Sequence, residues 1–171
     1  YKPVGFYPPE MAYSEKLGRI VSKMGFAWVV ADEILSGDLG KVQFDRIFYQ
    51  QGIDLKLFLR SRRISNFVAS GKAQTGRAFS FGIRKRAKGQ EFALTGVDGE
   101  TFGHHNKNYD RVLFEAYRQG KLEPMTLSEL AVKIETKEEI NPKEASWSTS
   151  SSELRRGVGF ALWDNPRNRI H

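Results

Sequence analysis

The chain has 171 residues, of which 40% are hydrophobic, and a formal net charge of +7. This length and this share of apolar residues suffice for one domain with a sizeable core, and they exclude a disordered tail. The absence of cysteine excludes disulfides and thiolate metal sites, and no long apolar run or signal-peptide pattern is present, so we expect a cytoplasmic protein without a membrane span.

The first sixty residues predict three strands and a helix. An apolar extended segment over 4–8 ends in two prolines, which stop regular structure there. Residues 14–25 place apolar side chains on one helical face, between a serine cap and a glycine stop. Segments 26–32 and 55–60 are β-branched, aromatic or leucine-rich on both parities, as buried strands are.

The rest of the chain predicts further helices and one more strand. A short helix over 64–68 and a looser segment precede a fourth strand at 91–97, and helices follow over 109–120 and from Thr126 onward. The tail is rich in Ser, Gly, Pro and Asn, with a short helix near 152–156. Strands that alternate with helices predict a parallel sheet or barrel, in which functional groups sit at the C-terminal strand ends.

Two basic clusters, at 60–63 and 84–89, raise the question of nucleic-acid binding, because Lys and Arg neutralise phosphates whatever the base sequence. Neither cluster is followed by aromatic residues at stacking spacing, and no nucleic-acid motif accompanies them. We interpret both as solvated loops. Nucleic-acid binding is the alternative, and it would weaken steeply with added salt.

Acidic side chains stand at several predicted strand ends. Glu10 follows the first strand and Asp98 the fourth, so on one rim of a parallel fold the two carboxylates could face each other. Such a pair is what glycosidic bond cleavage requires, although acids at strand ends also serve structural or solvent roles. Asp32 and Arg60 end two other strands, where they could contact a substrate or form a salt bridge at the rim.

Histidines and tryptophans in loops are further candidates. Adjacent histidines on a loop are expected to point in different directions, so we predict that His104 and His105 form no metal site and that one of them contacts a substrate hydroxyl. Trp147, among Ser and Thr, is either a plug for a loop core or a stacking platform for a flat ligand.

Two segments carry a family resemblance. "GFYPPEMAYSEKLGRIVSKMGFAWVVADE" closely resembles the nucleophile segment of glycoside hydrolase family 57, in which a Trp or Tyr, two residues and a Glu precede a helix and a strand. "VDGETFGHH" resembles the segment that carries the family's general acid/base. The stretch "LKLFLRSRRISNFVASG" between them and the later "ASWSTS" and "FALWDNPRNRIH" are also similar to the family.

The resemblance implies a retaining enzyme that acts on α-glucans without a cofactor, of the α-amylase, 4-α-glucanotransferase or branching-enzyme type. Glu10 would be the nucleophile and Asp98 the general acid/base. The implied substrate contacts are Tyr7, Asp32, Arg60, His104 and Trp147.

The resemblance also implies an α/β fold that is the C-terminal half of a (β/α)7 barrel, with four parallel strands, helices and a C-terminal loop-rich region. Residues 1–122 would be the half-barrel and 123–171 an extension that completes the cleft. The family's N-terminal His-Gln-Pro motif is absent here, so we expect an N-terminal segment or another chain to complete the barrel. Val97 and Ser61 stand where the family has acids, which makes a weak or inactive carbohydrate-binding or assembly subunit the alternative function.

Overall fold

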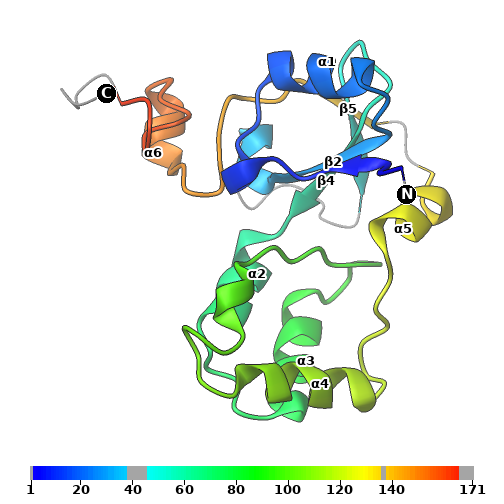
Figure 1. The fold of residues 1–171 in the computed structure, drawn as a ribbon, viewed down its shortest axis with the longest axis vertical. Coiled ribbons are helices and arrows are strands. Elements are labelled where there is room, and N and C mark those ends of the chain that lie inside the picture. The colour runs from blue at the N-terminus through cyan, green and yellow to red at the C-terminus, as the bar shows by residue number, and fades with distance from the viewer. Residues whose placement is uncertain (1, 38–45, 136–137, 166–171) are drawn as a thin grey trace. The chain divides into compact units, whose positions relative to one another are not determined.

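The computed structural model of the chain describes residues 2–37, 46–135 and 138–165. By its internal contacts the chain divides into two compact units (Figure 1). We call them the sheet unit, Tyr1–Arg60 with Leu127–His171, and the helical unit, Ser61–Thr126. The predicted division after residue 122, which concerns the extent of a cleft, stays a prediction.

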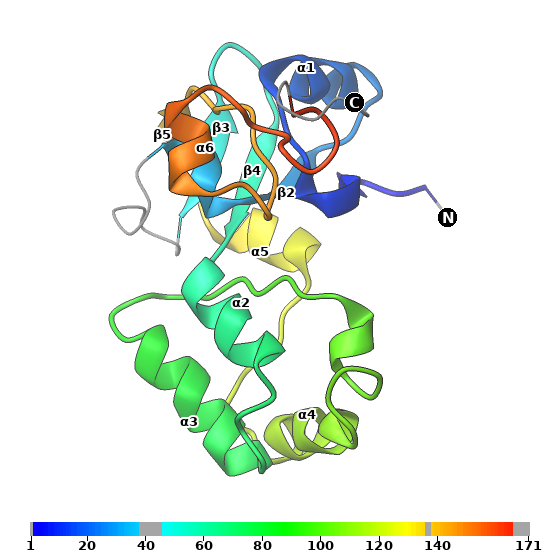
Figure 2. The same ribbon diagram turned by 90° about the vertical axis from the view of Figure 1, so that its left-hand side faces the viewer.

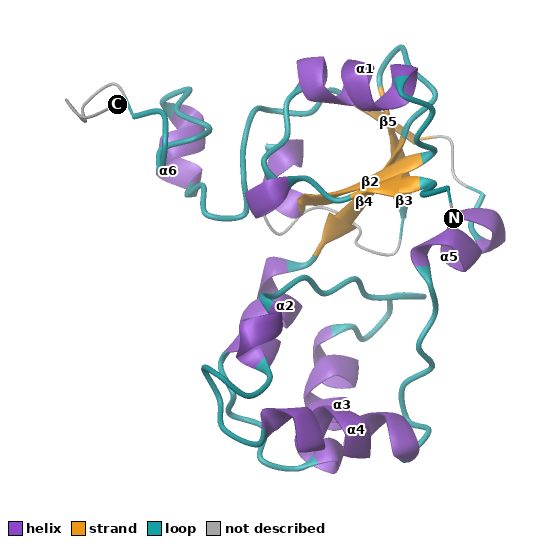
Figure 3. Ribbon diagram, viewed as in Figure 1, coloured by secondary structure: helices purple, strands orange, loops and turns teal. Residues whose placement is uncertain are grey.

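A mixed sheet of five described strands, in the order β1-β2-β4-β3-β5, forms the centre of the sheet unit (Figure 3). The strands are β1 (Gly5–Phe6), β2 (Trp28–Asp32), β3 (Ile47–Gln50), β4 (Lys56–Arg60) and β5 (Glu138–Ile140). β1, β2 and β4 run parallel, β3 is antiparallel to β4, and β5 is parallel to β3. The α/β class is therefore confirmed, and three predicted segments are strands, but the prediction of four parallel strands is wrong.

The core of the sheet unit lies between the central strands and helix α1 (Glu15–Lys23), which covers one face of the sheet (Figure 1). Ser14 caps α1, because its side chain accepts a hydrogen bond from the Leu17 N–H at 3.2 Å. Gly25 follows the helix with a φ of +84°, as the sequence predicts for a glycine stop. The buried members of this core are Tyr13, Val21, Val29, Ala31, Ile34, Leu35, Phe48, Leu55, Leu57, Leu59 and Ala145.

The prediction of a fourth strand at 91–97 is wrong, because this segment has no strand structure. Two of its backbone groups form hydrogen bonds with isolated groups of the helical unit. The Leu94 carbonyl accepts from the Ser61 N–H at 3.0 Å, and the Gly96 N–H donates to the Ser65 hydroxyl at 3.1 Å. Single bonds of this kind hold a segment extended without the ladder of a neighbouring strand, so an apolar run alone does not show a strand.

The helical unit contains α2 (Arg62–Ala69), α3 (Gly76–Arg86) and α4 (Tyr109–Arg118), seen from another side in Figure 2. α2 and α4 confirm the predicted helices. α3 lies in the segment predicted to be loose, and its last turn includes Arg84, Lys85 and Arg86 of the basic cluster at 84–89, so the interpretation as loop is wrong for these three residues. Cations in the last turn of a helix are favourable next to its negative end, so this part of the cluster has a structural explanation.

Two glycines explain why α3 looks irregular in the sequence. A Cβ at Gly76 would lie 2.5 Å from the Ala116 backbone nitrogen on α4, and one at Gly82 would lie 2.1 Å from the Phe67 ring on α2. Both positions therefore permit close helix packing rather than a break in the chain. The buried cluster of the unit comprises Val68, Ala73, Phe79, Tyr109, Val112 and Ala116.

Short elements complete the description. They are the one-turn 3-10 helices η1 (Pro9–Met11), η2 (Glu33–Ser36) and η3 (Gly99–Thr101) and the helices α5 (Leu127–Lys133) and α6 (Ser151–Arg155). α5 and α6 lie where the sequence predicts helices near the end of the chain. In the described part of the chain, no helix is long and apolar enough to cross a membrane.

Candidate active site

Glu10 lies just beyond the C-terminal end of β1, in a strained conformation. Its φ and ψ are 56° and 16°, and Met11 has a φ of 47°, so two consecutive residues with side chains occupy the left-handed region. Each such residue raises the free energy of the folded state by about 1 to 3 kcal/mol, and strain of this kind is found preferentially at functional sites. The Met11 side chain is fully buried, which holds the turn in place and leaves Glu10 exposed.

Trp147 holds Glu10 at two points. Its indole Nε1–H donates to Glu10 Oε2 at 2.6 Å, and its backbone N–H donates to the Glu10 carbonyl at 3.2 Å. Within the described residues no other hydrogen bond to the Glu10 carboxylate is found, so Oε1 is available to a ligand. The Glu10 carboxylate is thus oriented by a residue that lies 137 positions further along the chain.

The loop around Trp147 is itself well anchored. The Ser146 N–H donates to the Thr149 hydroxyl at 2.8 Å, and that hydroxyl donates to the Gly159 carbonyl at 2.5 Å. Both Ser146 and Thr149 are buried. On the other side, Tyr13 and Ala145 form a pair of backbone hydrogen bonds of 2.8 and 3.1 Å, which ties the segment after Glu10 to the one before Trp147.

Asp32 and Arg60 form a buried ion pair at the C-terminal ends of two neighbouring strands. They are register partners in β2 and β4, and Arg60 Nε donates to Asp32 Oδ2 at 2.6 Å. Their side chains are 0% and 8% exposed, so solvent screens this pair little. The other carboxylate oxygen of Asp32 accepts from the Ile34 N–H at 3.1 Å, which fixes the acid in the sheet.

Arg60 also connects the ion pair to the Trp147 loop. Its guanidinium carbon lies 5.2 Å from the centroid of the Trp147 ring, within the range of a cation–π contact. Four of the predicted site residues therefore form one continuous arrangement within the sheet unit, from Asp32 through Arg60 and Trp147 to Glu10. Tyr7, three residues before Glu10, lies at the same end of β1 and is 49% exposed.

The sequence does not predict the residues that anchor the turn at Glu10 on its core side. The Tyr13 hydroxyl donates to Gln50 Oε1 at 2.6 Å in the core, and Gln50 Nε2 donates to the Glu15 carbonyl at 3.1 Å. Burial, followed by the negative charge of Glu15, raises the pKa of Tyr13 well above its usual value, so its hydroxyl stays a donor. Gly18, a glycine inside the predicted helix, was the sign of this contact in the sequence. A Cβ at this position would lie 1.9 Å from Gln50 Oε1, so the glycine leaves room for the buried hydrogen bond.

Asp98 belongs to the helical unit, where it immediately precedes η3 and is exposed. Val97, in place of a family acid, packs against the buried cluster of that unit. Ser61, in place of another, caps α2, because its hydroxyl accepts from the Ile64 N–H at 3.4 Å. The sheet unit holds Glu10 and the helical unit Asp98, and the pairing of these two carboxylates stays a prediction.

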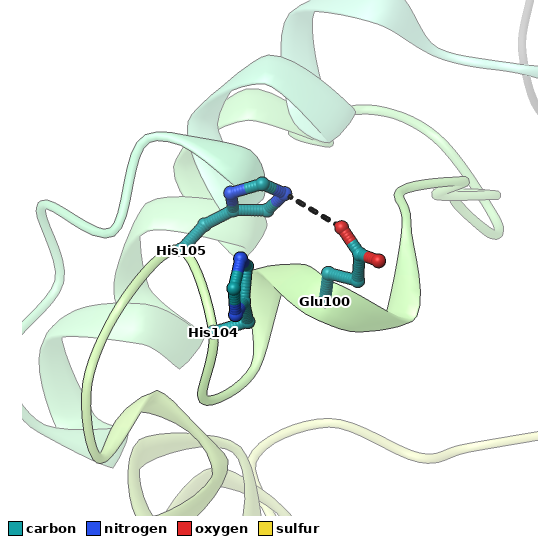
Figure 4. A group of neighbouring side chains, drawn as sticks. All are labelled: Glu100, His104 and His105. Carbon is teal, nitrogen blue, oxygen red and sulfur yellow. Dashed lines mark ion pairs between the residues drawn. The ribbon is translucent and has the colours of Figure 1, made fainter.

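The two histidines do not diverge as the sequence argument expects. The ring centroids of His104 and His105 lie 5.2 Å apart, and Glu100 Oε2 lies 3.3 Å from His105 Nε2 (Figure 4). All three side chains are exposed and lie in the helical unit. The role of His104 as a sugar contact stays a prediction.

Comparisons with known proteins concern the fold and the family of the chain. A search of the curated proteins found no match. Among solved structures, 4-alpha-glucanotransferase from Thermococcus litoralis has a TM-score of 0.68 at 18% identity, over 95% of this chain and 28% of that one. A GH57-type branching enzyme from the hyperthermophilic archaeon Pyrococcus horikoshii has a TM-score of 0.64 at 17% identity, over 87% of this chain and 41% of that one.

These likenesses establish that the chain shares its fold with a part of each enzyme. Both enzymes are larger, and the chain spans less than half the length of either. The sequence pattern of one family, described as glycosyl hydrolase family 57, matches residues 1–143. That match includes both candidate carboxylates and the two strands that end in the buried ion pair. The chain belongs to glycosyl hydrolase family 57.

Proposed function

We propose that this chain carries the reacting carboxylates of a retaining glycoside hydrolase or transferase that acts on α-glucans. The observation that carries the proposal is Glu10, a strained and exposed carboxylate at the end of a parallel strand, oriented by the Trp147 indole at 2.6 Å. Membership of the family and the α-glucan enzymes among the structural neighbours support the substrate class.

In the proposed reaction, Oε1 of Glu10 attacks the anomeric carbon while the bond from that carbon to the leaving oxygen breaks. Asp98 gives its proton to the leaving oxygen, and a glycosyl ester forms on Glu10. Water then attacks the ester in hydrolysis, or a sugar hydroxyl attacks it in transfer, and the proton of the attacking oxygen goes to Asp98. Two inversions give overall retention at the anomeric carbon.

The neighbouring residues divide into two groups in this proposal. Tyr7, His104 and the Trp147 ring contact the sugar. Arg60 and Asp32 are buried, so we assign them the task of supporting the Trp147 ring, through the 5.2 Å cation–π contact and the 2.6 Å ion pair. Each contact in this series limits the freedom of the next, and oriented reacting groups are a major source of rate enhancement.

The sheet of this chain is, in the same proposal, part of a (β/α)7 barrel. Its parallel strands β1, β2 and β4 present Glu10, Asp32 and Arg60 at their C-terminal ends, which is where barrel enzymes place their chemistry. The structural neighbours are larger than this chain, and we propose that an N-terminal segment or another chain supplies the remaining strands and the rest of the cleft.

Glu10→Gln tests the assignment of the nucleophile. The purified chain, with any segment that completes the barrel, is incubated with maltooligosaccharides, and product formation is followed by chromatography. We expect turnover to fall by at least about a thousandfold, because the amide keeps the shape of the side chain but is no nucleophile. Glu144→Gln, an exposed acid in the same unit, is the matched control and should retain activity. Unchanged turnover in Glu10→Gln would overturn the proposal.

The alternative is a carbohydrate-binding or assembly subunit without catalysis. It is favoured by Val97 and Ser61, which replace family acids and have structural roles here. Calorimetric titration with maltoheptaose separates the two functions. Binding without turnover in the completed barrel, with equal affinity in Glu10→Gln, supports the subunit, whereas turnover that depends on Glu10 supports the enzyme.

A further inference from the structure

Glu100, His104 and His105 form a compact group, which we call the loop triad (Figure 4). One ligand atom from each residue can be chosen so that all three atoms lie within 4.8 Å of one another. One carboxylate oxygen and two imidazole nitrogens form a donor set that borderline-soft divalent cations prefer. The proposed function makes no use of Glu100 or His105, and it gives His104 a sugar contact, for which a bound cation would compete.

A single tight turn brings the three residues together. The backbone N–H groups of His104 and His105 both donate to the Glu100 carbonyl, at 3.1 and 2.9 Å. Gly103 has a φ of +132°, a conformation that residues with side chains rarely adopt. The positions of all three Cα atoms are therefore set by local hydrogen bonds and one glycine.

The turn is attached to the core of the helical unit on both sides of the triad histidines. On the N-terminal side Thr101 is buried, and the Phe102 ring stacks on the Tyr109 ring with centroids 5.6 Å apart. On the C-terminal side the Asn106 side-chain amide donates to the carbonyls of Ala69 and Thr101, at 3.2 and 3.3 Å. The backbone is thus fastened, while the side chains of the loop triad extend outward into solvent.

We propose that the loop triad binds a zinc-type divalent cation, with Glu100, His104 and His105 as ligands and water in the remaining positions. Zinc lies about 2.0 to 2.2 Å from such nitrogen and oxygen atoms, so the three ligand atoms must approach each other by small side-chain rotations. All three side chains are exposed and are able to make these rotations. The carboxylate also places a negative charge beside the incoming cation.

Calorimetric titration of the tag-free chain with zinc chloride tests the site. We expect one zinc ion per chain, and Glu100→Gln, His104→Ala and His105→Ala should each lower the affinity by at least about tenfold, since each removes one of three protein ligands. Magnesium, which prefers oxygen donors, should not bind at the same concentration. Circular dichroism confirms that each variant is folded.

Two control variants show whether the binding is specific. His171→Ala removes the remaining histidine of the chain, and Asp110→Asn removes an exposed carboxylate from the same unit; both should keep the zinc affinity. If His171→Ala loses as much affinity as His104→Ala, or if the triad variants bind like the unmodified chain, zinc binding is adventitious and the proposal is overturned.

Nuclear magnetic resonance of the imidazole groups is a second measurement. It is made on the unmodified chain, so it does not depend on whether a variant is folded. Zinc should shift the ring signals of His104 and His105 together, at one equivalent, and leave that of His171 in place. Equal shifts of all three rings contradict the assigned ligands. Glu10→Gln keeps the loop triad intact, so its zinc binding should be unchanged even when its turnover is lost, which separates this site from the proposed reaction.

Discussion

Contacts on both sides of the turn hold Glu10 and Met11 at positive φ angles. Met11 is fully buried on the core side of the turn, and Trp147 fixes the exposed side by donating two hydrogen bonds to Glu10. A salt bridge between Asp32 and Arg60 is one of the two alternatives that the sequence offers, and the structure confirms it. The sequence does not connect Glu10 to Trp147, because a contact across 137 residues leaves no periodic pattern in the chain.

Trp147→Phe isolates the contribution of the indole N–H. Phenylalanine keeps an aromatic ring for Arg60 and for a sugar but cannot donate to Glu10. We expect kcat to fall by up to about a hundredfold with little change in KM, because the carboxylate loses its orientation while substrate contacts persist. Steady-state kinetics on maltooligosaccharides measure both constants.

Trp163→Phe is the matched control for that experiment. Trp163 is a partly exposed tryptophan of the same unit, stacked on Phe160, with no contact to Glu10. This variant should keep both constants. A change confined to KM in Trp147→Phe would mean that the ring binds sugar but does not position the nucleophile.

The helices and strands differ in how well local pattern predicts them. α1, α2 and α4 have clear apolar faces and were predicted, and β2 and β4 are apolar on both faces. β3 and β5 escaped prediction because they are short and partly polar, and their pairing depends on strands that are distant in sequence. α3 was missed because its glycines permit tight helix contacts yet look like breaks.

Gly18→Ala tests the anchoring role of α1. The added methyl group would overlap Gln50 Oε1 and the Tyr13 hydroxyl and so separate their buried hydrogen bond. We expect the free energy of unfolding to fall by about 1 to 3 kcal/mol, the usual effect of leaving a buried polar group unpaired, despite the higher helix propensity of alanine. Urea denaturation followed by circular dichroism measures it.

Gly99→Ala is the reference for that measurement. Nothing lies within 4 Å of a Cβ at Gly99, so this substitution should change the stability by only a few tenths of a kcal/mol. Equal stabilities of the Gly18→Ala and Gly99→Ala variants would show that the Tyr13 to Gln50 bond is not strained by the methyl group.

At the scale of the whole molecule, the residues of the proposed reaction belong to both units. The sheet unit holds Glu10 with its supporting residues, and the helical unit holds Asp98 and the loop triad. The predicted alternation of strands and helices placed both carboxylates on one rim, but that argument depended on a strand at 91–97, which is not formed. Their pairing therefore depends on the family resemblance of the two segments.

The anomeric configuration of the first product tests whether Glu10 and Asp98 act as the carboxylates of a retaining enzyme. Retaining enzymes place their two carboxyl groups about 5 to 5.5 Å apart, and inverting ones place them about 6.5 to 9.5 Å apart. We expect the first product released from an α-glucan to be the α anomer, which proton nuclear magnetic resonance detects before mutarotation. Initial release of the β anomer would contradict Glu10 as a nucleophile and favour a water-mediated displacement.

The hydrogen bonds that hold Glu10 also determine when its conformation can form. Its two partners are both atoms of Trp147, and the adjoining backbone pair joins Tyr13 to Ala145. During synthesis, Glu10 leaves the ribosome long before these partners exist. A chain interrupted before residue 145 contains the carboxylate and the Tyr13 to Gln50 bond but lacks the Ala145 and Trp147 hydrogen bonds, so the orientation of Glu10 is completed only when the last part of the chain has been made.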